Sequence, residues 1–431
     1  MTDRRALAII VAAALLTYAG ALFGLFQFDD YAVIVDNPLI HSWGAWFASM
    51  PGIRPLLKAS YTLCWMLAPA PWVFILFNLA CHAANGCLVY VLAQRWADDF
   101  GPQRAPPANV ALATALIFVL HPAQTEAVTY VAGRSVSLMA LFYLGALVAQ
   151  QNRRVWLSLA LFGLAMAVRE TAWTLPAALF LIAVARERNA RAGWVAARRH
   201  ATLLAMILVA VFALPTYRAM LVRSVELRGP IANLVAQVDG VSYLVTHPLL
   251  SLRLSIDPDI VAGAGGATWW LAAIALVSAA LGGVALLRHR PFVAFAILWF
   301  LLQLLPTNSL IARLDLANDR QLYLALVGPA LLVATALANL PPRAAGLAVP
   351  ALCVLLGSAT ILRNRDYASE IALWEATTRA SPGKARAWNN LGYAWQLAGD
   401  SERAATAYAH ALALEPGEYK ARVNLELLRR P

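Results

Sequence analysis

The sequence predicts an all-α fold: a polytopic membrane bundle of about eleven spans, followed by a short helical repeat. The first observation is composition, because the 431 residues are 61% hydrophobic and only 13% charged, whereas soluble domains are about 25% charged. The second is a series of apolar runs, separated by arginine-bearing gaps, that continues to about residue 361. The third is a different spacing of aromatic and small residues beyond that point, which is typical of a helical repeat. This pattern excludes a soluble globular enzyme and is typical of membrane helices.

The first apolar run, 7–26, is about 20 residues long, enough to cross roughly 30 Å of hydrocarbon. We interpret it as a retained span and not a cleaved signal peptide, whose apolar core is usually about 7–15 residues. If Arg4 and Arg5 are cytoplasmic, the arginine-rich gaps alternate as positive-inside sorting requires and the C-terminus is extracytoplasmic. The other expected spans are 72–93, 109–120, 136–150, 155–167, 171–185, 201–215, 267–287, 292–305, 321–339 and 344–361.

The formal net charge of +11 is dispersed among the gaps, so it indicates topology and not nucleic-acid binding. All four cysteines lie inside apolar runs, which predicts neither a disulfide framework nor a cysteine metal site. A long gap near 231–250 is partly amphipathic and is expected to form a helix in the membrane interface.

The tail, 362–431, carries residues at the spacing of a 34-residue tetratricopeptide repeat: Trp388, Leu391, Gly392, Trp395, Ala404, Tyr408, Ala411 and Pro416. We therefore predict two domains, a membrane domain over 1–361 and an extracytoplasmic repeat domain over 362–431. Gly392 and Ala404 are small where paired helices should approach closely. Because fewer than three repeats is short for an independent module, we expect the tail to lean on the membrane domain or to dimerise.

Candidate chemistry lies in the gaps assigned to the extracytoplasmic side. Asp29 and Asp30 follow the first span, where a carboxylate could serve as a base or simply be a solvated loop acid. His121 and Glu126 follow another span on the same side. With Asp29 they could bind a divalent cation, but the sequence leaves metal dependence open, and His121 could equally be a hydrogen-bonded loop anchor.

Arginines supply the matching positive charge. Arg54, Arg134 and Arg320 share this side, and guanidinium groups bind phosphate oxygens in bidentate fashion. Arg169 beside Glu170 at bilayer depth requires a partner or a polar cavity. Arg313 is interpreted as a surface cation, and the stripe Asn78, His82 and Asn85 as helix-packing contacts. Sequence motifs of soluble hydrolases, ATPases and zinc proteases are absent.

Together these segments resemble the transmembrane and tetratricopeptide-repeat-containing O-mannosyltransferases and their bacterial relatives, within the GT-C superfamily of glycosyltransferases. The resemblance is carried by Asp29-Asp30-Tyr31-Ala32 with Asn37-Pro38, Arg54-Pro55-Leu56, the His82 and Asn85 stripe, His121-Pro122 with Thr125-Glu126-Ala127-Val128, Gly133-Arg134, Arg169-Glu170 and Asp319-Arg320 with Leu322-Tyr323-Leu324. It spans most of the chain and includes the C-terminal repeat.

The resemblance implies an inverting transfer of a sugar from a polyprenyl-phosphate-linked donor to a hydroxyl, most simply a Ser or Thr of an exported protein. Asp29 would act as base, with Asp30, Glu126 and His121 in the catalytic group. Arg54, Arg134, Arg169 and Arg320 would hold the donor phosphate, and Glu170 would support them. The expected location is a bacterial inner membrane, with the site and the tail outside the cytoplasm and the lipid bilayer as a partner.

Three alternatives stay open at this point. The acceptor could be an envelope glycolipid or polysaccharide. The chain could be a non-catalytic membrane scaffold that gathers proteins through its repeat, or a transporter that moves a lipid or sugar without forming a glycosidic bond.

Overall fold

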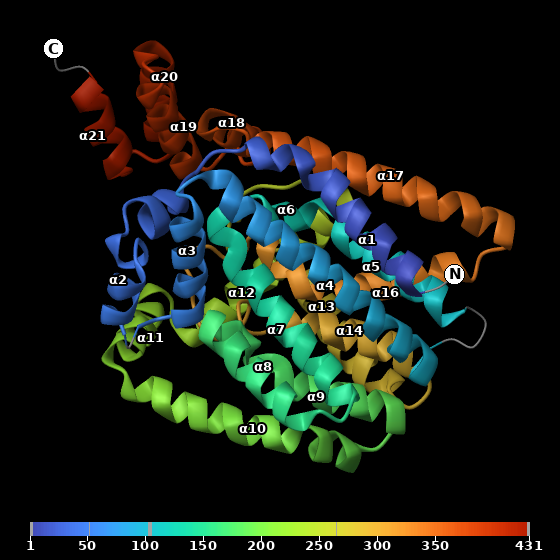
Figure 1. The fold of residues 1–431 in the computed structure, drawn as a ribbon. Helices are drawn as coiled ribbons and strands as arrows, with labels where there is room; N and C mark the ends of the chain where they lie inside the picture. The colour runs from blue at the N-terminus through green and yellow to red at the C-terminus, as the bar shows by residue number, and fades with distance from the viewer. Residues whose placement is uncertain (1–2, 51, 102–105, 264, 429–431) are drawn as a thin grey trace.

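The computed structural model describes residues 3–50, 52–101, 106–263 and 265–428, and within them the fold is helical with no strand (Figure 1). The predicted all-α class is confirmed. The apolar helices are α1 (Asp3–Tyr18), α4 (Pro71–Phe100), α5 (Pro107–Leu120), α7 (Arg134–Gln151), α8 (Val155–Val168), α9 (Leu175–Glu187), α10 (Ala190–Ala213), α13 (Ala267–Leu286), α14 (Pro291–Leu304), α16 (Val327–Ala338) and α17 (Pro342–Asp366).

Each expected apolar run therefore forms a helix at its place in the chain. Among the described residues, six helices are long and apolar enough to cross a membrane, or eight if each of two bent helix pairs counts as one span. The bends follow Leu120 and Ala325, with angles of 55° and 59°. The multi-pass character is supported, while the count of eleven spans stays a prediction.

Shorter helices fill the long gaps between the apolar ones. They are α2 (Trp43–Ala48), α3 (Pro55–Leu67), α6 (Thr125–Val128), α11 (Pro215–Leu227), α12 (Pro230–Leu244) and α15 (Leu322–Ala325). Proline is the first residue of α3, α11 and α12. Proline is tolerated there because a backbone N–H in the first turn has no hydrogen-bond partner within the helix. The helix expected near 231–250 is thus α12, which ends six residues earlier and continues as a π-helical turn, Val245–Ser251.

The two ends of the bundle differ. Helices α2, α3 and α11 lie at one end together with the C-terminal tail, whereas the N-terminus of the chain and the start of α17 lie at the opposite end (Figure 1). This arrangement gathers the long gaps and the tail on one side of the bundle. It also separates them from the arginine-rich gap that joins α9 to α10.

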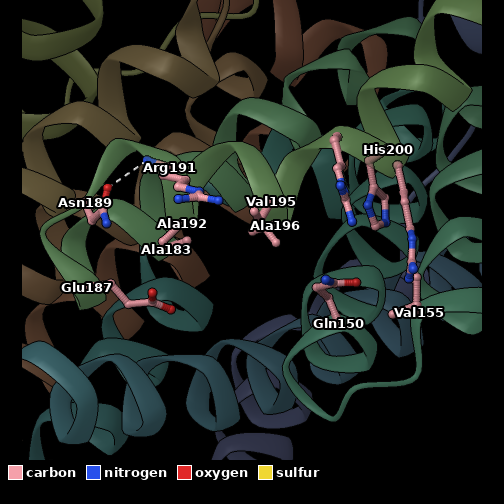
Figure 2. Close-up of a pocket in the computed structure, with 12 residues that line it drawn as sticks. Gln150, Val155, Ala183, Glu187, Asn189, Arg191, Ala192, Val195, Ala196 and His200 are labelled. Atoms are coloured by element: carbon pink, nitrogen blue, oxygen red, sulfur yellow. Dashed lines mark hydrogen bonds between the residues drawn. The ribbon is translucent and has the colours of Figure 1, made fainter.

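A cavity of about 510 Å³ opens where α9 turns into α10. Arg188 makes this turn in the left-handed conformation, with φ of 53°, and the side chain of Asn189 caps α10 by accepting the backbone N–H of Arg191 at 2.9 Å. Figure 2 shows the cap and the residues around the cavity. The cavity lies away from the end of the bundle where α2, α3, α11 and the tail gather (Figure 1).

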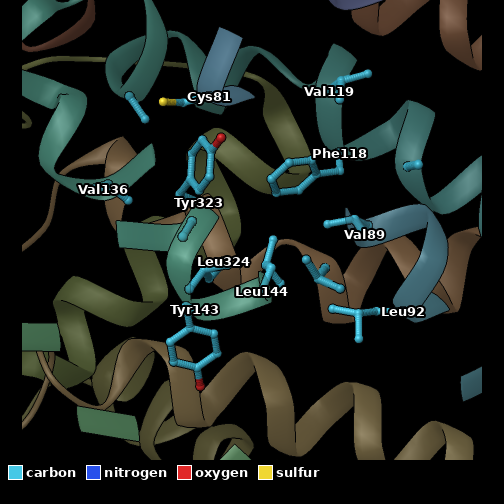
Figure 3. Close-up of a cluster of buried hydrophobic side chains, with 14 of the residues drawn as sticks. Cys81, Val89, Leu92, Phe118, Val119, Val136, Tyr143, Leu144, Tyr323 and Leu324 are labelled. Carbon is cyan, nitrogen blue, oxygen red and sulfur yellow. The ribbon is translucent and has the colours of Figure 1, made fainter. Parts of the chain in front are cut away.

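The core between α4, α5 and α7 consists of buried hydrophobic side chains, among them the rings of Phe118, Tyr143 and Tyr323 (Figure 3). The Tyr323 hydroxyl lies 2.8 Å from Nδ1 of His82 and accepts the Asn85 amide at 3.0 Å. Asn78 donates to the carbonyl of Val128 at 3.1 Å. The polar stripe therefore faces other helices, as expected, and satisfies buried polar groups that would otherwise cost free energy.

The tail consists of α18 (Glu370–Ala380), α19 (Ala385–Leu397), α20 (Ser401–Leu414) and α21 (Tyr419–Leu428). A Cβ on Gly392 would meet the Tyr408 ring at 2.7 Å, which explains the small residue at this helix contact. The domain boundary drawn at 361/362 falls inside α17, so the last apolar helix runs directly into the tail. Assignment of these helices to the tetratricopeptide class stays a prediction.

Candidate active site

The loop after the first apolar helix presents Asp29 to solvent. Asp29 is exposed, and its backbone N–H donates to the Tyr130 hydroxyl at 3.1 Å. The preceding residue, Phe28, has φ of 49°, a left-handed conformation that is unusual for a side chain with a Cβ and is commonly stabilised by surrounding structure at functional sites. No described residue forms a hydrogen bond to the carboxylate of Asp29, which leaves that group free to act on a ligand.

Asp30 turns the other way and is buried. Its Oδ1 accepts the backbone N–H of Ala132 at 2.7 Å and its Oδ2 accepts that of Gln27 at 3.0 Å. Burial raises the pKa of Asp30 to about 8, against the lowering effect of these two hydrogen bonds. The two neighbouring acids therefore differ in their contacts. Asp30 links its loop to the loop at 130–132 through hydrogen bonds, whereas Asp29 is exposed to solvent.

Glu126 lies buried on α6 and holds Arg320, which belongs to a turn 194 positions later. Its Oε2 accepts the backbone N–H of Arg320 at 2.9 Å, and its Oε1 lies 3.3 Å from Nε of the same arginine. Gly133 packs directly on the backbone of α6, and a Cβ at this position would collide with the Glu126 carbonyl. The terminal nitrogens of Arg320 form no hydrogen bond with a described residue and remain available to an anion.

Arg54 and Glu170 form the second ion pair of the site. Nε of Arg54 donates to Oε2 at 2.9 Å and Nη2 donates to Oε1 at 2.9 Å. Burial raises the pKa of Glu170, but Arg54 and then Arg169 outweigh it, so the net pKa lies below its ordinary value. Arg169 itself is buried and donates to the Ser135 hydroxyl at 2.6 Å, which gives it the polar partner expected for it.

Arg313 completes this group of cations. It is half-buried and forms no hydrogen bond or ion pair with any residue that the structure describes. Burial lowers its pKa to about 10, and the charges of Arg320 and Arg54 act in the same direction. Burial lowers the pKa of Arg169 as well, with Arg54, Arg313 and Arg320 adding to the effect. The expectation of a surface cation is therefore replaced by a half-buried one within an arginine cluster.

We call Arg54, Arg169, Arg313 and Arg320 the arginine cluster. Two carboxylates, Glu170 and Glu126, form ion pairs with Arg54 and Arg320, which leaves two members of the cluster without an ion-pair partner among the described residues. Asp29 lies close enough for its charge to act on Arg320. Buried charges without partners are costly, so this arrangement favours an anionic ligand beside the exposed carboxylate.

The structure does not bring Arg134 into this cluster. Its guanidinium is fully buried and donates to Asn78 at 2.6 Å and to the carbonyls of Ser60 and Phe74 at 2.9 Å. It also lies over the Tyr61 and Phe77 rings. Its observed contacts hold α3, α4 and α7 together, and its assignment to phosphate binding stays a prediction.

His121 is an N-cap. It is buried, and its Nδ1 accepts the backbone N–H of Ala123 at 3.2 Å. Within the described part of the chain, no group of three or more His, Cys, Asp or Glu side chains could hold a metal ion. Glu126 is already paired with Arg320, so the residues suggested as ligands do not form a fitting set.

Residues of the tail contribute to the site and carry no signal in the sequence. Gln27 donates to the carbonyl of Tyr367 at 2.5 Å, and Phe28 donates to Glu370 at 2.5 Å. A second contact joins Arg386 to Asp257 and Asp315, each at 2.6 Å. The tail thus packs against residues of the 1–361 segment, which is one of the two arrangements expected for it.

Comparisons with curated proteins give consistent names. The chain is 24% identical over 96% of its length to a protein O-mannosyl-transferase of Caenorhabditis elegans, of which it covers 63%. It is 22% identical over 97% of its length to human protein O-mannosyl-transferase TMTC3, of which it covers 52%. A shorter match, 30% identical over 34% of the chain, is to TMTC1 of Mus musculus, of which it covers 17%.

The chain spans between half and two thirds of the length of the relatives that it matches from end to end. No family model matches it. No solved structure matches it. The resemblance drawn from the acidic loop and the arginine motifs is nevertheless confirmed over almost the whole chain, and this protein is a relative of proteins named protein O-mannosyl-transferase.

Proposed function

We propose that this chain is an inverting glycosyltransferase that moves a sugar from a polyprenyl-phosphate-linked donor to a Ser or Thr hydroxyl of an exported protein. The observation that carries the proposal is the arginine cluster, in which Arg169 and Arg313 have no ion-pair partner among the described residues, close to the exposed carboxylate of Asp29. A phosphodiester donor brings one negative charge, and the departing lipid phosphate gains a second. The two guanidinium groups without an ion-pair partner suit that product.

In the proposed reaction the acceptor oxygen attacks the anomeric carbon and forms the new glycosidic bond. The bond between that carbon and the phosphate oxygen breaks, so polyprenyl phosphate leaves with the electron pair. Asp29 takes the proton of the hydroxyl. General-base assistance contributes about 10²–10⁴ in rate, and fixed cations stabilise charge that develops on the leaving phosphate.

The donor phosphate is assigned to Arg320 and Arg313, whose guanidinium groups have unoccupied donors. Arg54 and Arg169 contribute charge while remaining bound to Glu170 and Ser135. We further propose that this end of the bundle faces the outside of a bacterial inner membrane. The names of the relatives favour mannose as the first sugar to test and protein as the acceptor.

The test uses the full chain in lipid nanodiscs with a polyprenyl-phosphate-linked mannose and a Ser/Thr-rich acceptor peptide, with product detected by intact mass. Asp29→Asn should lower transfer by about 10²–10⁴. Asp36→Asn removes another exposed acid of the same loop and should stay within about twofold of the parent, because Asp36 lies outside the proposed machinery. Full transfer by Asp29→Asn would remove Asp29 from the mechanism.

A comparison of cells with and without the gene separates the acceptor classes. A gain in mass on exported proteins supports the proposal. A gain confined to envelope lipids would replace the protein acceptor by a glycolipid, and no gain in either pool would favour the scaffold.

A further inference from the structure

The cavity between α9 and α10 is lined by groups that the proposed transfer does not use. Three arginines, Arg191, Arg198 and Arg199, line its wall, together with one acid, Glu187. None of these four side chains forms a hydrogen bond or ion pair with a residue in the described ranges. The lining thus carries two positive charges in excess. Its volume of about 510 Å³ lies within the range of roughly 300–1,000 Å³ that is usual for small-ligand sites.

Two polar atoms of the lining residues lack a hydrogen-bond partner among the described residues. His200 is fully buried, and its Nδ1 has no hydrogen-bond partner among the described residues, nor does Oε1 of Gln150. The Ser158 hydroxyl donates to the carbonyl of Ala146 at 2.8 Å and lies 2.9 Å from Nε2 of His200. Because its proton is committed, Nε2 must be the donor, and Nδ1 of a neutral imidazole is then an acceptor. Buried acceptors of this kind can accept hydrogen bonds from the hydroxyl groups of a ligand.

The surroundings place the cavity at a membrane surface. Two tryptophans flank it, Trp156 with 84% and Trp194 with 64% of their surface exposed, each next to a lining residue and each at the start of an apolar helix. Exposed tryptophans at helix ends are typical of the lipid headgroup level. Beyond them α10 exposes Met206, Val209 and Phe212, a surface suited to acyl chains.

We propose that this cavity binds the headgroup of a hydroxyl-bearing anionic phospholipid, with phosphatidylglycerol as the simplest example. The arginines face the phosphate, and the headgroup hydroxyls donate to Nδ1 of His200 and Oε1 of Gln150. Since α8 and α9 have the cavity at one end, at Val155 and Glu187, and Arg169 of the arginine cluster at the other, the site is independent of the transfer reaction.

The test is native mass spectrometry of the full chain in detergent, titrated with equal mixtures of phosphatidylglycerol, phosphatidic acid and phosphatidylcholine. We expect phosphatidylglycerol to be retained in preference to both others. Equal retention of phosphatidic acid would overturn the role of the hydroxyls, and equal retention of phosphatidylcholine would overturn the site. Inorganic phosphate is added as competitor, and complete displacement at equimolar phosphate would make a free anion the ligand, against the proposal.

Paired variants locate the binding. Arg198→Gln/Arg199→Gln should weaken phosphatidylglycerol binding by about tenfold or more, because charge-assisted contacts to phosphate are the strong ones. Arg153→Gln/Arg154→Gln neutralises two neighbouring arginines of the same membrane face that do not line the cavity, and should leave binding unchanged. An equal loss in both pairs would indicate diffuse attraction and sink the proposal. If the first pair fails to fold, the lipid preference of the parent chain still decides.

Discussion

The Glu370 carboxylate accepts the backbone N–H of Phe28 at 2.5 Å, although 342 positions separate the two residues. The other oxygen of Glu370 accepts Nε1 of Trp374 at 2.7 Å, and the Phe28 ring packs edge-on against the Trp374 ring with centroids 5.1 Å apart. Phe28 has a positive φ and immediately precedes Asp29. The first helix of the tail therefore holds the loop that presents the proposed base.

Replacement of Glu370 should affect the reaction through Asp29. Glu370→Ala removes the acceptor for Phe28 and should lower kcat by about tenfold, with little change in the donor KM, because a misplaced base slows the chemical step without touching the phosphate site. Glu370→Gln keeps an oxygen acceptor and should restore kcat. Steady-state kinetics of both variants provide the check. Equal activity of Glu370→Ala and the parent would show that α18 does not position the loop.

Arg313 should separate binding from stability. Arg313→Gln removes a half-buried cation that has no partner among the described residues, so the melting temperature in detergent should stay equal or rise. The donor KM should increase by about tenfold, because a contact to the phosphate is lost. Arg288→Gln, at an exposed turn, is the matched control and should change neither quantity. An unchanged KM with an unchanged melting temperature would return Arg313 to the surface role first expected for it, and a fall in melting temperature with unchanged KM would indicate a structural role.

The residues of the candidate site were named from the sequence and their catalytic roles stay predictions, whereas the contacts that these residues make were not foreseen. The acidic loop and the arginine motifs were predicted because each is a local cluster of polar residues beside an apolar run. Whether a given arginine faces a ligand or the core depends on packing, and neither the internal contacts of Arg134 nor the half-buried place of Arg313 has a local signature. Contacts of Gln27 and Phe28 with the tail join the two ends of the chain, and no pattern within either segment encodes them.

Arg134 should be a determinant of folding. Arg134→Ala leaves buried acceptors on Asn78, Ser60 and Phe74 without a donor, at about 1–3 kcal/mol each. We expect little monodisperse protein and a strongly reduced melting temperature. Arg134→Lys keeps the positive charge but lacks the planar guanidinium with its several N–H donors, so it should recover only part of the stability. The yield of monodisperse protein on size exclusion and the melting temperature give the answer, with Arg288→Ala as an exposed control. A stable Arg134→Ala with weakened donor binding would instead support the phosphate role.

Asp30 should make stability depend on pH. Burial raises its pKa from 3.8 to about 8 in the folded chain, and the charges of Asp29 and Glu370 add to this. Between these values the folded state keeps a proton that the unfolded state has lost, so stability should fall as pH rises through this interval. Asp30→Asn cannot titrate and should lack this component of the slope, whereas Asp36→Asn should keep it. Melting temperatures measured across the interval test the sign, and parallel curves for Asp30→Asn and the parent would contradict it.

The contact of Arg386 with the membrane domain should hold the tail in place. Its guanidinium binds Asp257 through two hydrogen bonds of 2.6 Å and also contacts Asp315 at 2.6 Å. Asp257 is almost completely buried, so Arg386→Ala leaves a buried acid whose remaining charged partner, among the residues that the structure describes, is Lys384 at 3.6 Å. The tail should then exchange amide hydrogens faster over α18 and α19, because local opening becomes easier.

Arg403→Ala supplies the matched control, since its ion pair with Asp400 is exposed and lies within the tail. Exposed pairs contribute about 0–1 kcal/mol, so exchange in α18 should stay at the level of the parent. If Arg386→Ala leaves exchange unchanged while Glu370→Ala raises it, the tail is held by its contact with the Asp29 loop alone. If both variants raise exchange in α18, the two contacts act together, and transfer activity should fall in Arg386→Ala as well, because the same helix carries Glu370.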